Sequence, residues 1–147
     1  RIPPRSVPIA VDDCGIGGGV TDQIRVEGWN VIPINAALCP DSLKEDNQYP
    51  NIRSFLWFGV AEAALRGDVS ITRLPGDMIQ ALRSQLQLPR YKMDNKGRRV
   101  VEEKHDVNFK KRSGGRSPDL ADAFNLSMTP VSSVLGEQAA GRIQVAR

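Results

Sequence analysis

The feature that most constrains the fold lies in residues 7–35, where an apolar run, a glycine-rich segment and a second apolar run follow one another. Residues 7–12 (VPIAVD) predict a buried strand, and residues 15–19 (GIGGG) predict a loop. A short helix that ends at Gly28 follows, because glycine is the usual residue beyond a helix C-terminus. Residues 29–35 (WNVIPIN) predict a second strand. A strand, a helix and a strand within about thirty residues are typical of a βαβ unit, whose strands run parallel.

The rest of the chain alternates between apolar periodic segments and segments rich in turn residues. Together with the βαβ unit, these patterns predict one α/β domain over residues 1–128 and a flexible tail over residues 129–147. In order, they predict a loop at 36–50, a helix at 51–66 capped by Asn51, a strand at 69–74, and a helix at 76–88 with Pro75 in its first turn. A β-hairpin at 91–103 and a flexible basic loop at 110–117 follow. The last predicted element is a helix at 117–128, with Ser117 as its cap and Pro118 as its first position.

Length and composition fit one globular domain and argue against several classes of protein. The 147 residues are 40% apolar and 25% charged, which is unlike a disordered chain. The longest apolar run, residues 55–65, is interrupted by Glu62 and is too short to cross a bilayer, so we expect no membrane partner. Two cysteines, Cys14 and Cys39, and one histidine argue against a disulfide framework and a zinc site. Because the sequence begins with Arg1 and shows no secretory leader, we expect a fragment or a processed product.

The net charge of +3 is unevenly distributed along the chain. Residues 90–116 hold ten lysines and arginines against four acids. A local excess of positive charge favours a polyanion such as nucleic acid as the partner. A solvated charged loop with no partner is the alternative interpretation of the same residues.

The segment IAVDDCGIGGGVTD (residues 9–22) allows three interpretations: a phosphate cradle, a metal site or a structural turn. It lacks the lysine and the serine or threonine of a P-loop. Val20 also stands where the GxGxxG pattern needs its third glycine, so nucleotide binding is the weakest interpretation. A turn remains open, because glycine permits backbone conformations that other residues avoid.

Four carboxylates make the metal interpretation more specific. Asp12 and Asp13 end an apolar strand, where an ionised side chain is costly unless a positive charge meets it. Asp119 and Asp122 share one face of the last predicted helix, where capping of the helix dipole is the alternative role. Carboxylates bind hard divalent cations, and the basic segment just before that helix suits a phosphate backbone. The combination indicates a site for phosphodiester cleavage.

The order and spacing of these motifs resemble the nuclease domain of phage terminase large subunits, the DNA-packaging proteins of tailed phages and prophages. The resemblance is collinear over residues 7–128, and its most specific parts are VDDCGIGGGVTD and GRSPDLADA. It implies that residues 1–128 are the C-terminal portion of such a domain, with a ribonuclease H-like mixed sheet flanked by helices and a basic β-hairpin. It also implies an endonuclease that uses two Mg²⁺ or Mn²⁺ ions to cut concatemeric double-stranded viral DNA in the bacterial cytoplasm. The implied partners are DNA, the terminase ATPase domain, the small subunit and the portal.

The resemblance assigns roles to particular residues. Asp12 and Asp119 match its catalytic metal ligands, and Asp13 and Asp122 are further candidate ligands. The glycine loop leaves room beside Asp12. The loop glycines are Gly15, Gly17, Gly18 and Gly19, and the residues expected to contact DNA are Lys96, Arg98, Lys104, Lys110, Lys111, Arg112 and Arg116.

The sequence departs from the family pattern at its start. The family's first catalytic aspartate belongs to a strand upstream of the glycine loop, and the residues before Val7 do not contain it. We therefore expect this chain alone to hold an incomplete site. Two alternatives stay open: a catalytically incomplete remnant that binds DNA or the motor, and another ribonuclease H-like protein such as a junction resolvase or transposase core.

Overall fold

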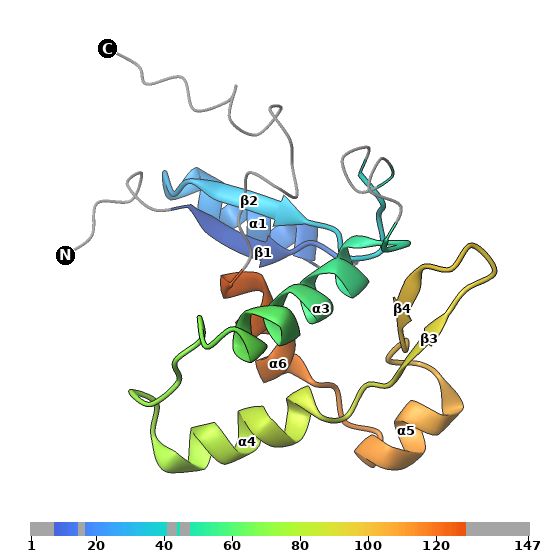
Figure 1. Ribbon diagram of the computed structural model, residues 1–147. Coiled ribbons are helices and arrows are strands. Elements are labelled where there is room, and N and C mark those ends of the chain that lie inside the picture. The colour runs from blue at the N-terminus through green and yellow to red at the C-terminus, as the bar shows by residue number, and fades with distance from the viewer. Residues whose placement is uncertain (1–7, 15–16, 41–43, 45–47, 129–147) are drawn as a thin grey trace.

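The computed structural model describes residues 8–14, 17–40, 44 and 48–128. Strand β1 (Ile9–Asp12), helix α1 (Gly17–Val26) and strand β2 (Val31–Ile34) form the predicted βαβ unit. The two strands are parallel, with Ile9 opposite Val31 and Asp12 opposite Ile34, so this prediction is confirmed. Figure 1 shows the unit at one end of the molecule, with α1 behind the two strands.

The predicted loop over residues 15–19 is wrong for its last three positions. Helix α1 already begins at Gly17, so Gly17, Gly18 and Gly19 form its first turn. Glycine is a poor helix former, but tertiary contacts override propensity, and α1 packs against both strands. Gly15 lies outside the described residues.

Side-chain alternation along the strands decides what each face of the β1–β2 pair contacts. Ala10 and its register partner Ile32 belong to the main apolar core, together with Ile34. That face packs on Ile52 and Leu56 of α3 (Ile52–Leu65) and on Leu126 of α6 (Asp119–Ser127). Helix α3 is capped as predicted: the Asn51 side chain accepts a hydrogen bond from the Ser54 amide at 2.9 Å. The face therefore brings β1 next to α6 (Figure 1).

The second half of the chain adds a hairpin and two helices. Strands β3 (Tyr91–Met93) and β4 (Arg99–Val101) are antiparallel, as predicted. Gly97 in their turn has a φ of 75°, which favours glycine. Helix α4 (Gly76–Leu86) packs against α6, and β4 packs against α3. Within the described residues, the strands form two separate two-stranded sheets, one parallel and one antiparallel.

Two predicted segments are wrong. Residues 69–74 form no strand: the Leu74 amide bonds the Ile71 carbonyl at 3.1 Å, so local turn bonds replace a ladder. The first half of the expected basic loop is helical, because Lys110 to Ser113 belong to α5 (Val107–Ser113). The Asp106 side chain caps α5. Phe109 is the buried apolar residue that anchors this helix in the core.

The start of α6 also differs from the prediction. Pro118, not Ser117, occupies the N-cap position, and it makes no side-chain capping bond. Gln85 of α4 supplies one instead, since its Oε1 accepts a hydrogen bond from the Ala121 amide at 3.1 Å. A residue from another helix thus caps the turn that carries Asp119 and Asp122. No helix in the described part of the chain is long and apolar enough to cross a membrane.

Candidate functional site

A groove of about 770 Å³ runs between the edge of β1 and α6. Its walls include the apolar side chains of Ile9, Val11 and Leu126. Its polar lining consists of Asp12, Lys104, Asp119, Asp122 and Ser127. Three of the four carboxylates expected at the site are therefore brought to one groove, although more than a hundred residues separate Asp12 from Asp119 in the sequence.

The two adjacent aspartates at the end of β1 point in different directions. Asp12 lines the groove, and its Oδ1 accepts a hydrogen bond from the Cys14 amide at 3.2 Å. Asp13 accepts a hydrogen bond from the Thr21 hydroxyl at 3.2 Å, and Thr21 is a buried residue of α1. Successive residues of a strand face opposite sides of a sheet, which explains the difference. Asp13 joins β1 to α1, and only Asp12 reaches the groove.

The two aspartates of α6 differ in their surroundings. Asp119 is the first residue of the helix and is exposed. Asp122 is one turn later, and only 16% of its side chain is exposed. Acids suit the first turn of a helix because they meet the positive end of its dipole, so capping explains part of their placement.

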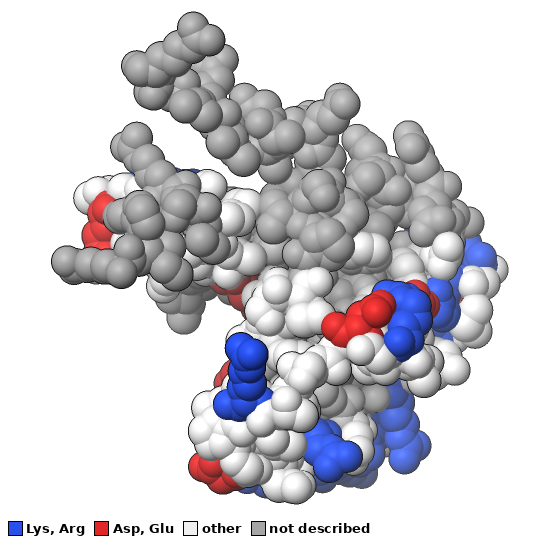
Figure 2. Space-filling view, turned by 60° about the vertical axis from the view of Figure 1, so that its left-hand side comes forward, with Lys and Arg blue, Asp and Glu red and all other residues white. Residues whose placement is uncertain are grey.

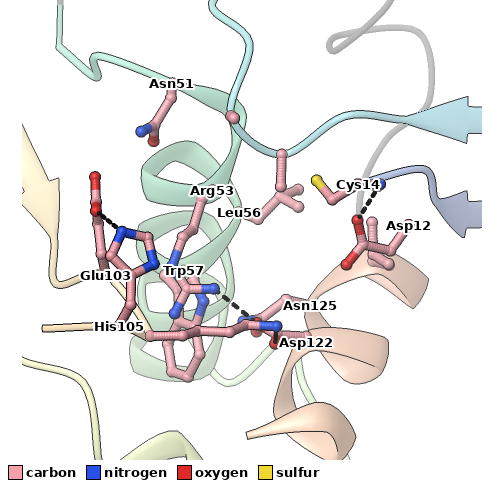
Figure 3. Close-up of a pocket in the computed structure, with 14 residues that line it drawn as sticks. Asp12, Cys14, Asn51, Arg53, Leu56, Trp57, Glu103, His105, Asp122 and Asn125 are labelled. Atoms are coloured by element: carbon pink, nitrogen blue, oxygen red, sulfur yellow. Dashed lines mark hydrogen bonds and ion pairs between the residues drawn. The ribbon is translucent and has the colours of Figure 1, made fainter. Parts of the chain in front are cut away.

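Two cations meet the Asp122 carboxylate. Arg53 Nη1 lies 3.1 Å from Asp122 Oδ1, and Lys104 Nζ lies 2.6 Å from Oδ2. Figure 3 shows the Arg53 guanidinium reaching Asp122 from α3. Helix α3, helix α6 and the segment after β4 thus meet at one carboxylate. Each oxygen of Asp122 already has a positively charged partner.

A smaller pocket of about 250 Å³ adjoins the groove and shares Asp12, Lys104, Asp122 and Leu126 with it. Leu56 and Trp57 form apolar parts of its wall (Figure 3). His105 stands at its exposed rim, where Nε2 lies 2.5 Å from Glu103 Oε2. Sequence reasoning missed Arg53, Trp57 and His105. Arg53 carried one signal: a cation in the first turn of a helix opposes the helix dipole, so another interaction must favour it.

Cys14 also lines this pocket, and its thiol is weakly reactive. Burial raises the pKa of the Cys14 thiol above its usual value, and the nearby Asp12 carboxylate raises it further. The thiol therefore stays protonated at neutral pH and is a poor nucleophile or metal ligand.

The groove does not by itself make a complete metal site. Among the described residues, no group of three or more His, Cys, Asp or Glu side chains is placed to hold a metal ion. Asp12 and Asp119 line the groove, but the oxygens of Asp122 face Arg53 and Lys104 instead. A hard divalent cation takes about six oxygen ligands, several of which water can supply, so Asp12 and Asp119 form a partial set of protein ligands.

The predicted DNA-contacting cations fall into two groups. Arg98 is paired with Asp94 at 2.8 Å, Lys104 with Asp122 and Arg112 with Glu102. The other four are exposed, and no ion pair is formed by them within the described residues: Lys96, Lys110, Lys111 and Arg116. Figure 2 shows the basic side chains of one face spread over its lower half, with acidic groups between them. They form no single continuous basic surface there.

Comparison with known proteins gives a likeness in structure. No protein-family model matches the sequence. No curated protein matches it either. The nuclease domain of the large terminase subunit gp2 of bacterial virus Sf6 matches with a TM-score of 0.64 at 20% identity, over 83% of this chain and 64% of that one. A point mutant of that domain with manganese matches with a TM-score of 0.63, and the same mutant with calcium with 0.64, both at 20% identity.

Each of these matches aligns 83% of this chain with 65% or less of the solved domain. The likeness confirms the predicted fold class: an α/β chain with the ribonuclease H-like fold of terminase nuclease domains. At this level of identity it establishes the fold, and function has to be argued from the groove.

Proposed function

We propose that this chain is part of the nuclease domain of a phage-type DNA-packaging terminase and that it contributes to metal-dependent cleavage of double-stranded DNA. The observation that carries the proposal is the groove, where Asp12 of β1, Asp119 of α6 and Lys104 meet in the fold of a nuclease domain. Carboxylates beside a lysine suit the binding of a metal ion and a phosphodiester together. The carboxylates attract the metal ion, and the lysine attracts the phosphate.

The proposed cofactor is Mg²⁺ or Mn²⁺. Asp12 and Asp119 are the proposed ligands, and Asp13 and Asp122 have roles in holding the surrounding elements. Two carboxylates fall short of a full ligand set. Because the chain spans only about two thirds of the solved domains, we propose that the remaining ligands come from a segment outside this sequence.

The proposed partner is the DNA backbone, held by exposed cations for which the described part of the chain supplies no acidic partner. Lys110 and Lys111 of α5 are exposed on the same helix, and Lys96 is exposed in the hairpin turn. Neutralising phosphates with such side chains releases counterions and makes binding depend on salt. The terminase ATPase domain, the small subunit and the portal, and a bacterial cytoplasmic location, follow as proposals from the same assignment.

A plasmid-nicking assay over a titration of Mn²⁺ tests the proposal. We expect any Mn²⁺-dependent nicking, by this chain alone or together with the segment that completes its ligands, to fall at least about 100-fold in the Asp119→Asn variant, as removal of a group that stabilises the transition state commonly does. Asp77→Asn, an exposed acid in the first turn of α4, is the matched control and should cut as the wild type does. Equal cutting by the wild type and Asp119→Asn would remove the enzymatic role from this chain.

One observation favours a second function, a DNA-binding module without catalysis. The described residues hold no three-donor metal group. In that case DNA affinity should survive Asp12→Asn, since removing an acid leaves every phosphate contact in place, and no Mn²⁺ concentration should produce nicking. A preference for branched over linear duplex in the same binding assay would indicate a junction resolvase instead.

A further inference from the structure

Arg53 lies beside the groove, and the proposed function gives it no role. It is the second residue of α3, and only 13% of its side chain is exposed. Its guanidinium carbon lies 5.6 Å from the centre of the Trp57 ring, one helical turn away. Nη1 donates to Asp122, which lies 69 residues further along the chain. Arg53 is therefore held between an aromatic ring and one carboxylate.

This placement is unfavourable for stability. Arg53 Nε and Nη2 are buried and have no hydrogen-bond partner among the described residues. A buried donor without a partner loses its hydrogen bonds to water and gains nothing in return. The positive charge also stands at the positive end of the α3 dipole. An apolar side chain in the same space would bury no unsatisfied donor, and Asp122 would keep Lys104 as its partner, so stability alone does not explain an arginine here.

We propose that Arg53 is a positioning residue that keeps Asp122 out of the metal site. The proposal rests on the proposed function, because it assumes that the groove takes a divalent cation. Arg53 occupies Oδ1 of Asp122 and leaves Oδ2 to Lys104. Asp122 then serves as the anchor that holds the Lys104 ammonium at the boundary of groove and pocket. Asp12 and Asp119 remain as the groove carboxylates that have no ion-pair partner in the described chain.

The arrangement has a consequence that an ordinary structural contact lacks. Removing the Arg53 charge frees Oδ1 of Asp122 next to the groove, and it also removes a positive charge that repels a divalent cation. Both effects strengthen metal binding. A purely structural arginine would change the stability of the fold and leave the metal affinity unaltered.

Mn²⁺ binding by the full chain tests this, measured from the electron paramagnetic resonance signal of the free ion. We expect Arg53→Met to lower the Mn²⁺ dissociation constant about three- to tenfold, since a nearby like charge is lost. The methionine keeps an apolar stem against Trp57. Arg53→Lys retains the charge and should bind as the wild type does. Arg66→Met is the matched control, because it removes the same charge at an exposed site on the far end of α3.

The double variant decides whether Arg53 acts through Asp122. If it does, the gain of Arg53→Met disappears in an Asp122→Asn background, as interaction through a shared partner requires. If Arg53→Met still raises Mn²⁺ affinity in the Asp122→Asn background, the proposed role of Arg53 is wrong. The role is also wrong if Arg53→Met does not raise the affinity at all while Asp119→Asn lowers it. In both cases the proposed function still stands. Mn²⁺ affinity that is unchanged in Asp119→Asn removes the metal site itself. Circular dichroism melting checks folding, and Arg53→Gln replaces Arg53→Met if that variant does not fold.

Discussion

Two arginines, Arg53 in helix α3 and Arg99 packed against that helix, show how differently the same side chain is used in two regions of this molecule. Arg99 of β4 lies over the rings of Tyr49 and Phe58, at 4.8 and 4.7 Å, and Arg53 lies over Trp57. Each is paired with one acid, Glu62 for Arg99 and Asp122 for Arg53. Both arginines combine a cation–π contact with an ion pair, and this combination could not be predicted from the sequence alone.

The difference lies in the remaining donors. Arg99 Nη1 donates to Glu62, while Nη2 lies 2.9 Å from Gln48 Oε1 and 2.5 Å from the Tyr49 hydroxyl. Arg53 has one bonded nitrogen and two buried ones that have no partner in the described chain. A guanidinium whose donors are satisfied holds elements together, and one left partly unsatisfied costs stability. Within the described residues, both end nitrogens of Arg99 are bonded, whereas Arg53 is satisfied only in part.

Arg99→Ala gives the largest expected effect. We expect the free energy of unfolding to fall by about 2–3 kcal/mol, because several hydrogen bonds to a charged group and two aromatic contacts are lost together. Urea unfolding followed by circular dichroism measures it. Arg53→Met is the matched variant, with an expected loss of no more than about 1 kcal/mol. Equal losses in the two variants would erase the distinction between them.

The second prediction compares paired cations with free ones in DNA binding. The double variant Lys110→Ala, Lys111→Ala should bind duplex DNA about 10- to 100-fold more weakly near 0.1 M salt, and the slope of log K against log salt should fall by up to about 1.8. Fluorescence anisotropy over a salt series measures both. Arg98→Ala is the control, since its guanidinium is paired with Asp94 and should leave the slope unchanged. A slope change in Arg98→Ala alone would move the DNA interface to the hairpin.

Gln85→Ala sharpens the comparison at the groove. The side chain caps the α6 turn that holds Asp119 and Asp122, so we expect a loss of about 1 kcal/mol in unfolding free energy, the usual value of a capping bond. Mn²⁺ affinity should weaken with it, because the cap fixes the direction of that turn. Gln87→Ala, at the C-cap of α4, is the control and should leave Mn²⁺ affinity as it is. Loss of stability with unchanged metal affinity would show that the turn holds its carboxylates without the cap.

Much of the fold followed from local patterns. The βαβ unit and the hairpin were predictable because apolar runs, a glycine in a turn and short spacings act within a few residues. Helix α5 was not, because its seven residues carry three adjacent cations and depend on Asp106 as a cap and Phe109 as an anchor. The capping of α6 by Gln85 was equally invisible, since the two partners are 36 residues apart.

The site was predictable in part for the same reason. Strand alternation would have separated Asp12 from Asp13, because adjacent strand residues face opposite sides of a sheet. The pairing of Asp122 with Arg53 joins different helices, and no spacing rule leads from one to the other. Charge balance was the available signal: a half-buried acid in a chain rich in cations is expected to find one.

The smallest expected effect concerns Asp94, which organises the hairpin turn. The Arg98 backbone amide donates to its carboxylate, and together with the Arg98 side chain and the Lys96 amide it holds the pKa of Asp94 below its usual value. A depressed carboxyl pKa contributes stability that is present at neutral pH and lost as the pH falls below about 4 through the folded-state pKa. Between about pH 5 and pH 3, one unit on either side of pH 4, the stability of Asp94→Asn should therefore change less with pH than the stability of the wild type.

Thermal melting over this pH range measures the difference, with Asp68→Asn as the exposed control, whose carboxylate pairs with the neighbouring Arg66. Because Asp94 belongs to the hairpin and is remote from α6, Mn²⁺ affinity at neutral pH should be the same in Asp94→Asn and the wild type. A change in both stability and metal affinity would mean that the hairpin and the groove respond as one unit, and the contrast between Arg99 and Arg53 would then be one of degree.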